Sequence, residues 1–266
     1  MTVDRSRVVQ IERSWATAER RVVDTVARLD PSWGSTTFDL ADGVAVLAGP
    51  GLFVNQVMAA GLTGSVTGAD LDLLERRAAD VGVSPALQTC EASSRDLIEL
   101  LTRRGYERED GREAVVHDLD EIAVVPHPFT IEFVDGEGVA EWQEASAEGW
   151  GHVTPERRAA SDVYGAAAAE VDDPGLLVAR DGDGTVVGAA MLRIEDGFAT
   201  LGGMSTRRPA RGRGVQSALI VHRLTVAKER GCAFAVSSAH PGGGSRRNLG
   251  RLGFRPSHTH RIWVKP

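Results

Sequence analysis

The sequence predicts an α/β (α+β) chain made of two related domains. Segments with apolar residues at helical spacing alternate along the chain with segments of strand-like character. In the second half, three strand-like segments follow one another with short turns between them, which is typical of an antiparallel meander. An order of strand, helix, strand and short helix in residues 53–106 recurs in residues 198–254, which indicates a duplicated fold.

The first half opens with a helix over residues 5–29, because apolar residues such as Val8, Ile11 and Trp15 recur there at helical spacing. Asp30-Pro31 ends this helix, since proline cannot continue it. The other elements expected in this half are, in chain order, strands over 36–40, 44–47 and 53–62, a helix over 70–81, a strand over 85–90, a helix over 93–104 closed by Gly105, and a strand over 113–119.

Pro126-His127-Pro128 has the stiffness of a linker and divides the chain into two expected domains, residues 1–125 and 126–266. Thr154-Pro155-Glu156 predicts a helix start, with an N-cap threonine, proline at the first helical position and an early acid. The elements expected in the second half are a strand over 129–134, helices over 138–150 and from 154, strands over 175–180, 186–194 and 198–205, a helix over 215–230, a strand over 233–238, a helix over 245–252 and a strand over 259–264.

The composition excludes several classes of protein. The charged first residues argue against a secretory signal, and no apolar run approaches the length of a membrane-spanning helix. The two cysteines, Cys90 and Cys232, lie far apart in strand-like runs, so we expect small core residues of a reduced, cytoplasmic protein. His258 and His260 would share one face of a strand, but no third ligand is near them in the sequence, so no metal site is expected.

The motif Arg211-Gly212-Arg213-Gly214 lies between a predicted strand and a predicted helix. Its two glycines allow a sharp turn and let a ligand approach the main chain closely. The helix that begins at Val215 directs unpaired N–H groups and the positive end of its dipole at whatever fills the turn. Together with Arg207 and Arg208, the motif predicts a site for a multiply charged phosphate.

The charge distribution supports an anion site near the C-terminus. Residues 201–266 contain 13 Lys and Arg against one acid, whereas residues 1–200 contain 17 basic and 36 acidic residues. Nucleic acid is a weaker explanation, because no zinc-finger spacing or RNA-binding signature is present. A dinucleotide site is also disfavoured, since the strand over 233–238 ends without the acid that binds a ribose. A Walker-type loop is excluded because no Gly-Lys-Ser/Thr occurs.

Residues 129–266 resemble a GNAT-superfamily N-acetyltransferase. The pyrophosphate-loop pattern of that family, Gln/Arg-x-x-Gly-x-Gly/Ala, is matched at Arg211 and Gly214, while Gln216 replaces the usual small residue. The helix, the strand and the Asn248–Phe254 segment that follow keep the order of the family. The resemblance implies two GNAT-like domains in tandem, each a mixed, mostly antiparallel central sheet flanked by helices, the first without a pyrophosphate loop.

The resemblance implies an N-acetyltransferase that uses acetyl-CoA, without a metal, and transfers the acetyl group to a primary amine by direct attack in a ternary complex. The acceptor would be a small molecule or a peptide, and the acidic first 200 residues favour a cationic one. A non-catalytic acetyl-CoA-binding or regulatory module is the alternative. No nucleic acid or membrane partner is expected, and the chain is expected to be a monomer or a homodimer. The residues expected to bind the cofactor are Met204, Ser205, Thr206, Arg211, Gly212, Arg213, Gly214, Val215, Gln216, Ser217 and Asn248.

The chain departs from the family at the general acid. Many members use a tyrosine four residues before the glycine of the terminal Gly-Phe pair, and that position here is Leu249. General acid–base help is worth about 10²–10⁴-fold, so its loss would slow an enzyme without abolishing catalysis. The residues that remain as catalytic candidates are His240 and Ser245 for the acid, and Glu144 and Glu148 for the base.

Overall fold

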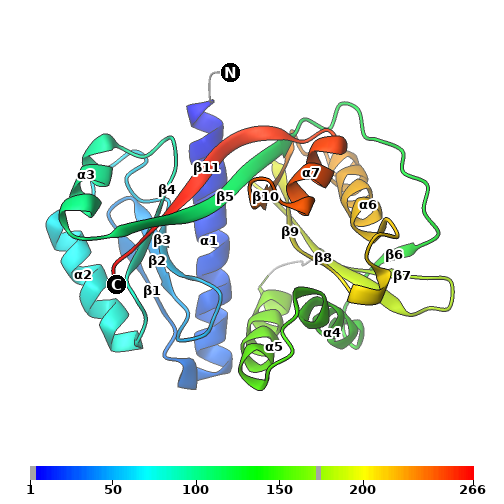
Figure 1. Cartoon of the computed structure of the whole chain (residues 1–266), viewed down its shortest axis with the longest axis horizontal. Helices are drawn as coiled ribbons and strands as arrows, with labels where there is room; N and C mark the ends of the chain where they lie inside the picture. The colour runs from blue at the N-terminus through cyan, green and yellow to red at the C-terminus, as the bar shows by residue number, and fades with distance from the viewer. Residues whose placement is uncertain (1–3, 172–174) are drawn as a thin grey trace. The chain divides into compact units, whose positions relative to one another are not determined.

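The computed structural model describes residues 4–171 and 175–266, which divide into two compact units (Figure 1). The N-terminal unit consists of the chain up to Glu113 together with Ser257–Pro266, and the C-terminal unit of Ala114–Pro256. The units therefore divide the chain at a different point from the linker-based boundary between residues 125 and 126. The last ten residues of the sequence, expected in the second domain, belong to the first unit.

In the N-terminal unit, helix α1 begins at its N-cap Asp4, whose carboxylate accepts hydrogen bonds from the N–H groups of Ser6 and Arg7. The helix packs on the first three strands of a mixed sheet in the order β1-β2-β3-β4-β11. The elements of the N-terminal unit are α1 (Arg5–Leu29), the 3₁₀ turn η1 (Pro31–Trp33), β1 (Thr36–Leu40), β2 (Gly43–Leu47), β3 (Asn55–Met58), α2 (Gly68–Val81), β4 (Ala86–Thr89), α3 (Arg95–Arg103) and β11 (Arg255–Val264). Strands β1 to β3 are antiparallel, β4 runs parallel to β3, and β11 runs antiparallel to β4.

In the C-terminal unit, an antiparallel meander is followed by one parallel strand. Its elements are the end of β5 (Glu107–His117), β6 (Thr130–Phe133), α4 (Gly138–Trp150), α5 (Pro155–Glu170), β7 (Gly175–Arg180), β8 (Val186–Glu195), β9 (Phe198–Thr206), the 3₁₀ turn η2 (Arg208–Ala210), α6 (Val215–Glu229), β10 (Ala235–Ala239) and α7 (Gly244–Arg251). The strand order is β5-β10-β9-β8-β7-β6, with β10 parallel to β9 and the meander pairs antiparallel. The strands of each unit, which belong to one 11-stranded sheet, are therefore mixed and mostly antiparallel, as predicted.

The expected duplication is present in the structure. The order β3-α2-β4-α3 in the N-terminal unit repeats as β9-α6-β10-α7 in the C-terminal unit, and each parallel pair is joined by a helix. A crossover helix is the usual way to connect parallel neighbours. None of the described helices has the length and apolar character that a membrane-spanning helix requires.

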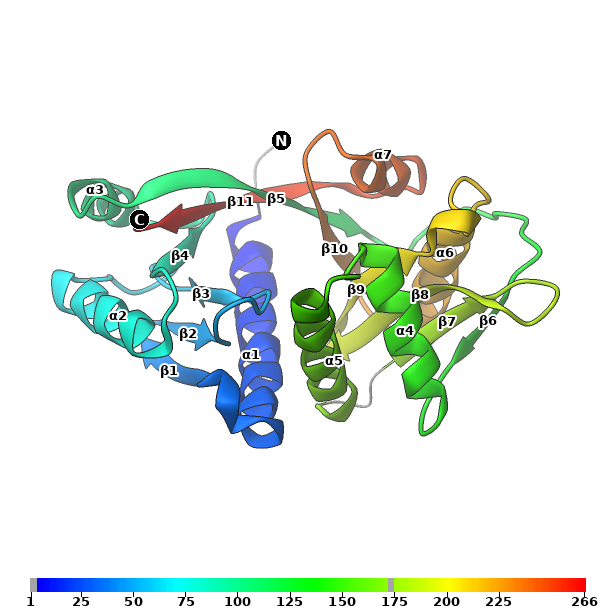
Figure 2. The same cartoon turned by 60° about the horizontal axis from the view of Figure 1, so that its bottom comes forward.

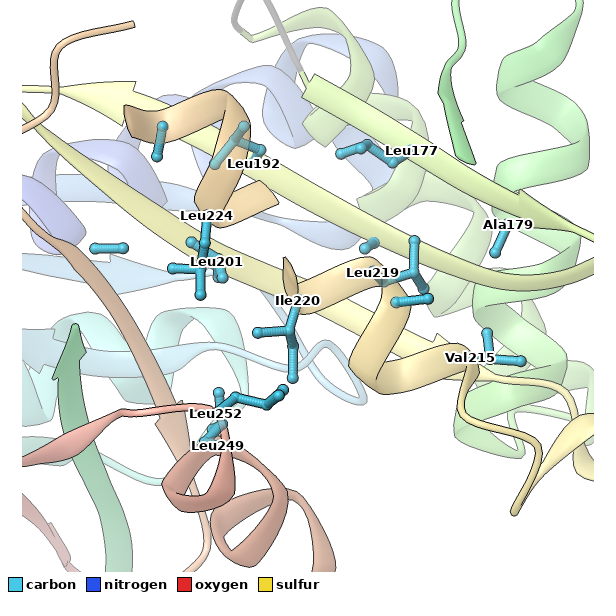
Figure 3. Close-up of a cluster of buried hydrophobic side chains, with 14 of the residues drawn as sticks. Leu177, Ala179, Leu192, Leu201, Val215, Leu219, Ile220, Leu224, Leu249 and Leu252 are labelled. Atoms are coloured by element: carbon cyan, nitrogen blue, oxygen red, sulfur yellow. The ribbon is translucent and has the colours of Figure 1, made fainter. Parts of the chain in front are cut away.

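Helices cover both faces of the C-terminal sheet (Figure 2). Leu176 and Val178 of β7 pack with α4 on one face, whereas Leu177 and Ala179 pack with α6 on the other. Figure 3 shows the α6 side, where Leu249 of α7 and Leu252, which follows this helix, point towards α6. Each fully buried leucine of this kind stabilises the unit by about 1.5–3 kcal/mol relative to an exposed one. This packing fixes the start of α6 relative to β9 and α7.

Three strands differ from their predicted bounds by several residues at one end. β3 covers only Asn55–Met58 because Ala59 and Gly61, with φ of 58° and 70°, leave the extended conformation. β5 begins at Glu107 and β11 at Arg255, several residues before their apolar alternation starts. The first residues of both strands are mostly polar, so the sequence pattern alone does not mark them as strands.

Candidate functional site

A β-bulge interrupts the pairing of β8 with β9. The register shifts between Ala189 opposite Ser205 and Met191 opposite Gly202, so that two residues of β9, Gly203 and Met204, face one residue of β8. Gly203 has a φ of 54°. A bulge of this kind bends its strand and changes the direction of the residues that follow. The end of β9 is therefore turned away from a regular ladder.

Side chains from both faces of the sheet satisfy the carbonyl groups at the bulge. From α4, Trp142 Nε1 donates to the Ala190 carbonyl at 3.0 Å. From α6, Arg223 Nη1 donates to the carbonyls of Met191 at 2.8 Å and Gly202 at 3.1 Å. Arg223 is fully buried, and burial lowers the pKa of its guanidinium to about 9, so it remains charged at neutral pH.

After Thr200, and thus before the bulge, β9 separates from its parallel neighbour. β10 pairs with β9 only at Ala199 and Thr200, and no further register pair joins them within the described residues. The Ser237 hydroxyl donates to the Leu201 carbonyl at 2.8 Å, which satisfies the first carbonyl after the paired region. The edge of β9 at Met204–Thr206 is consequently open on the side of β10.

The glycine turn has the backbone conformation that the sequence predicts. Gly212 and Gly214 have φ of 79° and 90°, and a Cβ at either position would meet no protein atom within 4 Å. Gly214 is the N-cap of α6, and no side chain of the described part of the chain caps this helix. The first helical hydrogen bond runs from Ala218 N–H to Gly214 O at 3.0 Å. The preceding N–H groups are thus available to an anion.

A cleft of about 710 Å³ lies between the end of β9, the start of α6 and the start of α7. Ten of the eleven predicted cofactor residues line it, and the exception is Arg213. The residues that sequence reasoning did not include are Gly149, Trp150, Ala210, Gly244 and Arg251. Arg251 follows Asn248 by three residues on α7, a helical spacing that could have revealed it. The lining contains Arg211 and Arg251 and, among the described residues, no acid.

A second hollow of about 600 Å³ lies near the start of α4. Its lining includes Asp135 and Glu195 together with Arg193 and Arg230, so its charges are mixed. Carboxylates repel a phosphate group, whereas the cleft beside α6 combines two arginines with an uncapped helix start. The cleft beside α6 is therefore the candidate functional site.

Polar side chains join the starts of α6 and α7 along the cleft. Gln216 Nε2 donates to Ser245 Oγ at 2.9 Å, and Asn248 Nδ2 donates to Gln216 Oε1 at 3.0 Å. Ser217 Oγ donates to Asn248 Oδ1 at 3.2 Å. Gln216, which departs from the family pattern, thus connects the two helices. The network holds Ser245 and Asn248 beside the glycine turn.

The arginines near the turn make different contacts. Arg211 donates to the carbonyls of Gly149 at 2.8 Å and Thr206 at 3.3 Å, which connects the end of α4 to the end of β9. The Arg213 side chain lies 3.4 Å from Asp181 and over the Phe129 ring. Arg213 can therefore contribute its main chain to the turn, while its charge is directed elsewhere.

Of the four catalytic candidates, only Ser245 lines the cleft in the described structure. Glu144 lies 2.6 Å from Arg158, whose hydrogen bond lowers the pKa of that carboxyl group. Glu148 lies 2.9 Å from Arg207. His240 is exposed and follows β10. The four residues are therefore not brought together around one point.

Leu249, at the position of the family's tyrosine, is 1% exposed and belongs to the hydrophobic core of the C-terminal unit. Figure 3 places it beside Leu252, among the side chains that pack under α6. The two tyrosines of the chain lie elsewhere: Tyr164 is in α5, and Tyr106 is buried in the N-terminal unit. The departure at Leu249 thus removes an acidic hydroxyl and adds core packing.

The expectation that His258 and His260 have no third ligand nearby is wrong. Glu12 of α1 lies between them, with Oε1 at 2.8 Å from His258 Nε2 and 2.7 Å from His260 Nε2. These residues are buried in the N-terminal unit and do not line the cleft. The 246 residues that separate Glu12 from His258 hide this proximity from any sequence pattern.

Comparisons with known proteins agree with this geometry. Residues 137–254 match the model of the Acetyltransferase (GNAT) family. A GCN5-related N-acetyltransferase from Kribbella flavida superposes with a TM-score of 0.64 at 20% identity, over 92% of this chain and 95% of that chain. A GCN5-related N-acetyltransferase from Sphaerobacter thermophilus gives 0.59 at 19% identity, over 97% and 93%.

A tandem GNAT protein from the clavulanic acid biosynthesis pathway gives a TM-score of 0.58 at 12% identity, over 85% of this chain and 78% of that chain. At these identities the three likenesses show the fold, and they extend it over both halves of the chain. No curated protein matches the sequence significantly. Residues 137–254, which match the family model, contain the glycine turn, the cleft and the bulge, and the fold of the whole chain is similar to that of GNAT structures, a tandem GNAT protein among them.

Proposed function

We propose that the chain binds acetyl-CoA in the cleft beside α6 and transfers its acetyl group to a primary amine by direct attack in a ternary complex. The observation that carries this proposal is that the end of β9, which is separated from β10, and the uncapped start of α6 line the same cleft. One end of the cleft is suited to a diphosphate and the other to an extended amide chain. Coenzyme A combines these two groups in one molecule.

The N–H groups of Val215, Gln216 and Ser217 would bind the diphosphate, assisted by the charges of Arg211 and Arg251. The helix dipole adds a favourable contribution of about 0.3–1 kcal/mol for an anion at the first turn. The pantetheine arm would pair with the open edge of β9 at Met204–Thr206 in the manner of an added strand. Asn248, on α7, would contact the far side of the cofactor.

Acetyl transfer from a thioester requires a neutral amine, a stabilised oxyanion and a protonated thiolate. Main-chain N–H groups near the bulge are the proposed partners of the oxyanion. Positioning of two reactants can supply about 7–11 kcal/mol, so a weak acid is compatible with catalysis. Ser245 is the proposed acid: because its Oγ accepts from Gln216, its own hydrogen is left to donate.

The proposed bases are Glu144, which lies beside Arg158, and Glu148, which lies beside Arg207. His240 is a second proposed acid. The acceptor is proposed to be cationic, either a metabolite amine or a peptide amine, since residues 1–200 are strongly acidic. We also propose that the chain acts in the cytoplasm as a monomer or homodimer, where its free thiols Cys90 and Cys232 stay reduced.

Titration calorimetry with acetyl-CoA tests the site through Gly214→Leu. A side chain there would enter the space of the diphosphate, so we expect the Kd for acetyl-CoA to rise about tenfold or more, a loss of about 1.4 kcal/mol. The matched control is Gly231→Leu at the other end of α6, where φ is 74° and no atom lies within 4 Å of an added Cβ. Both variants pay a similar backbone cost of about 1–2 kcal/mol. Equal acetyl-CoA affinity in the two variants would refute the site.

A non-catalytic acetyl-CoA-binding or regulatory module is the second candidate function, because Leu249 replaces the acid of the family and is packed in the core. Free thiol release from acetyl-CoA, measured over a panel of metabolite amines and lysine peptides, separates the two functions. We expect at least one amine to raise thiol release above the rate of acetyl-CoA alone. Tight acetyl-CoA binding without release on any amine would favour the module.

A further inference from the structure

The N-terminal unit contains a buried cluster of ionisable side chains, Glu12, His258 and His260. Their exposed fractions are 2%, 3% and 5%, and one donor atom from each lies within 4.8 Å of the other two. His258 and His260 are two positions apart on β11, so both imidazoles project from the same face of the strand. Glu12 reaches them from the second turn of α1.

The surroundings hold these side chains in fixed orientations. Gln88 Nε2 donates to Glu12 Oε2 at 2.7 Å, and the Ser257 hydroxyl lies 3.0 Å from His258 Nδ1. Trp15 lies edge-on to the His260 ring, with centroids 5.4 Å apart. The Glu12 oxygen that faces the two imidazoles is thus oriented by an amide on the opposite oxygen. A buried carboxylate is stable only with such compensation.

We propose that Glu12, His258 and His260 bind one divalent transition-metal ion, of which Zn²⁺ fits the donor set best. The ligands are Nε2 of each histidine and Oε1 of Glu12. Two imidazole nitrogens and one carboxylate oxygen form a donor set that binds Zn²⁺ in proteins. Ser257 and Gln88 take the role of the outer partners that orient metal ligands.

The distances between Glu12 Oε1 and the two Nε2 atoms show how far the side chains must move when an ion binds. Donors bound at about 2.0–2.1 Å around a tetrahedral ion lie about 3.4 Å apart. Oε1 is 2.7–2.8 Å from the two Nε2 atoms, as in hydrogen bonds donated by Nε2–H groups. Each gap therefore widens by about 0.6 Å when an ion replaces the two hydrogens. A coordinating imidazole nitrogen carries no hydrogen, so each Nε2 hydrogen must leave that atom when the ion binds.

The expected consequence is a metal-dependent junction between the first helix and the last strand of the chain. An ion that binds only the folded state raises the melting temperature, and the rise grows with the logarithm of the ratio of free ion concentration to Kd. For a chain of this size the rise is roughly 5–10 °C at a hundredfold excess over Kd. This effect is independent of the acetyl-CoA cleft, so it does not rest on the proposed function.

The test uses the full chain without an affinity tag, stripped with a chelator and titrated with ZnCl₂. We expect one ion per chain by elemental analysis and calorimetry, and visible absorption bands when Co²⁺ is used instead. Glu12→Gln keeps an oxygen that accepts both N–H groups, so it should fold and bind the ion at least about a hundredfold more weakly. His260→Gln should give the same loss.

The matched control is Glu75→Gln, which changes a carboxylate paired with Arg104 and Lys265 in the same unit. It should leave the stoichiometry and the Kd for Zn²⁺ unchanged. Binding of equal strength in wild type and Glu12→Gln would identify an adventitious ion and overturn the proposal. If the variants fail to fold by circular dichroism, the wild type decides alone: no bound ion and no change in melting temperature with Zn²⁺ or Co²⁺ would overturn it as well.

Discussion

At the end of β5, the His117 side chain holds the chain in an unusual conformation. Its Nδ1 accepts the N–H of Leu119 at 3.0 Å, and Leu119 has a φ of 64°, which is uncommon for a leucine. The imidazole also lies edge-on to Phe254, with centroids 5.2 Å apart. Burial lowers the pKa of His117 below its usual value of 6.5. The neutral form is needed, because a protonated Nδ1 cannot accept a hydrogen bond.

His117 should therefore make unfolding depend on pH. Since its pKa is lower in the folded state, the unfolded chain binds the proton first, and the contribution of His117 is complete above about pH 6.5. It is lost as pH falls from there through the folded-state pKa. In His117→Asn the amide oxygen still accepts from Leu119 but cannot titrate, so chemical denaturation at pH 5 to 7 should show a smaller slope of the free energy of unfolding.

His127→Asn is the control for this prediction. His127 Nδ1 accepts the N–H of Phe129 at 3.2 Å and its ring is stacked on Phe129, but it is exposed. The pair of variants separates burial from the local hydrogen bond. An unchanged slope in His117→Asn would show that the imidazole does not contribute to the pH dependence.

Single residues also show which features of the site could be predicted from the sequence. The positive φ of Gly212 and Gly214 follows from their residue type and their place before a helix. The position of Asn248 at the cleft follows from the order of the elements after the glycine turn. The contact of Arg213 with Asp181 depends on the position of a distant hairpin, so it could not be predicted. The same holds for Glu12 with its two histidines.

At the scale of elements, the bulge between β8 and β9 depends on a residue of a third element. Arg223 of α6 donates to carbonyls on both strands, and its Nη2 lies 3.0 Å from Met204 Sδ. In the described structure its hydrogen-bond partners are carbonyl oxygens and a thioether, so the buried charge is compensated by dipoles. In sequence Arg223 lies four residues after Leu219, on the apolar face of the helix, but an arginine does not by itself indicate burial.

Arg223→Met should weaken binding of the pantetheine arm. Met fills a similar volume but leaves the Met191 and Gly202 carbonyls without a donor, which costs about 1–3 kcal/mol for each buried group. The bulge then relaxes and displaces Met204–Thr206. We expect the Kd for acetyl-CoA to rise about tenfold, while the Kd for ADP, which has the diphosphate but no arm, stays within about twofold.

Arg223→Lys provides the comparison, because it retains the charge but cannot reach both carbonyls with a planar fork. Its affinity for acetyl-CoA should fall between that of the wild type and that of Arg223→Met. A parallel loss of acetyl-CoA and ADP binding would mean that Arg223 supports the whole cleft rather than the bulge. Wild-type affinity for both ligands would contradict its role.

Element order was largely predictable, and strand pairing was only partly so. Proline, glycine and N-cap residues mark the ends of most helices, as at Thr154 and Gly105, and they act within a few residues. Pairing depends on contacts between distant segments. The separation of β9 from β10, which opens the cleft, follows from where the ladder stops at Thr200, and no local pattern encodes that point.

For the molecule as a whole, the main surprise is the strand that completes the N-terminal unit. β11 follows α7 in the sequence, and its order after the Gly-Phe pair led to its assignment to the second domain. In the structure its residues Arg261–Val264 pair with β4, whose four residues are all buried. A strand can join whichever sheet offers an open edge, and the sequence of β11 does not specify the partner.

Deletion of Ser257–Pro266 should therefore unfold the N-terminal unit. The deletion removes the β4 pairing, the Lys265–Glu75 ion pair at 2.9 Å, and Trp263, whose Nε1 donates to Thr89 Oγ1 at 3.0 Å. Loss of one buried tryptophan side chain costs about 3–5 kcal/mol, against a total stability of about 5–15 kcal/mol for a domain. Hydrogen exchange should show loss of protection in α1 and β4, with protection retained in β8 and α6.

Removal of Pro266 alone, which is exposed, is the control for this deletion. Because the acetyl-CoA cleft is lined entirely by residues of the C-terminal unit, its affinity should persist in the truncated chain. Retained protection of β4 would show that β11 is dispensable for the N-terminal sheet.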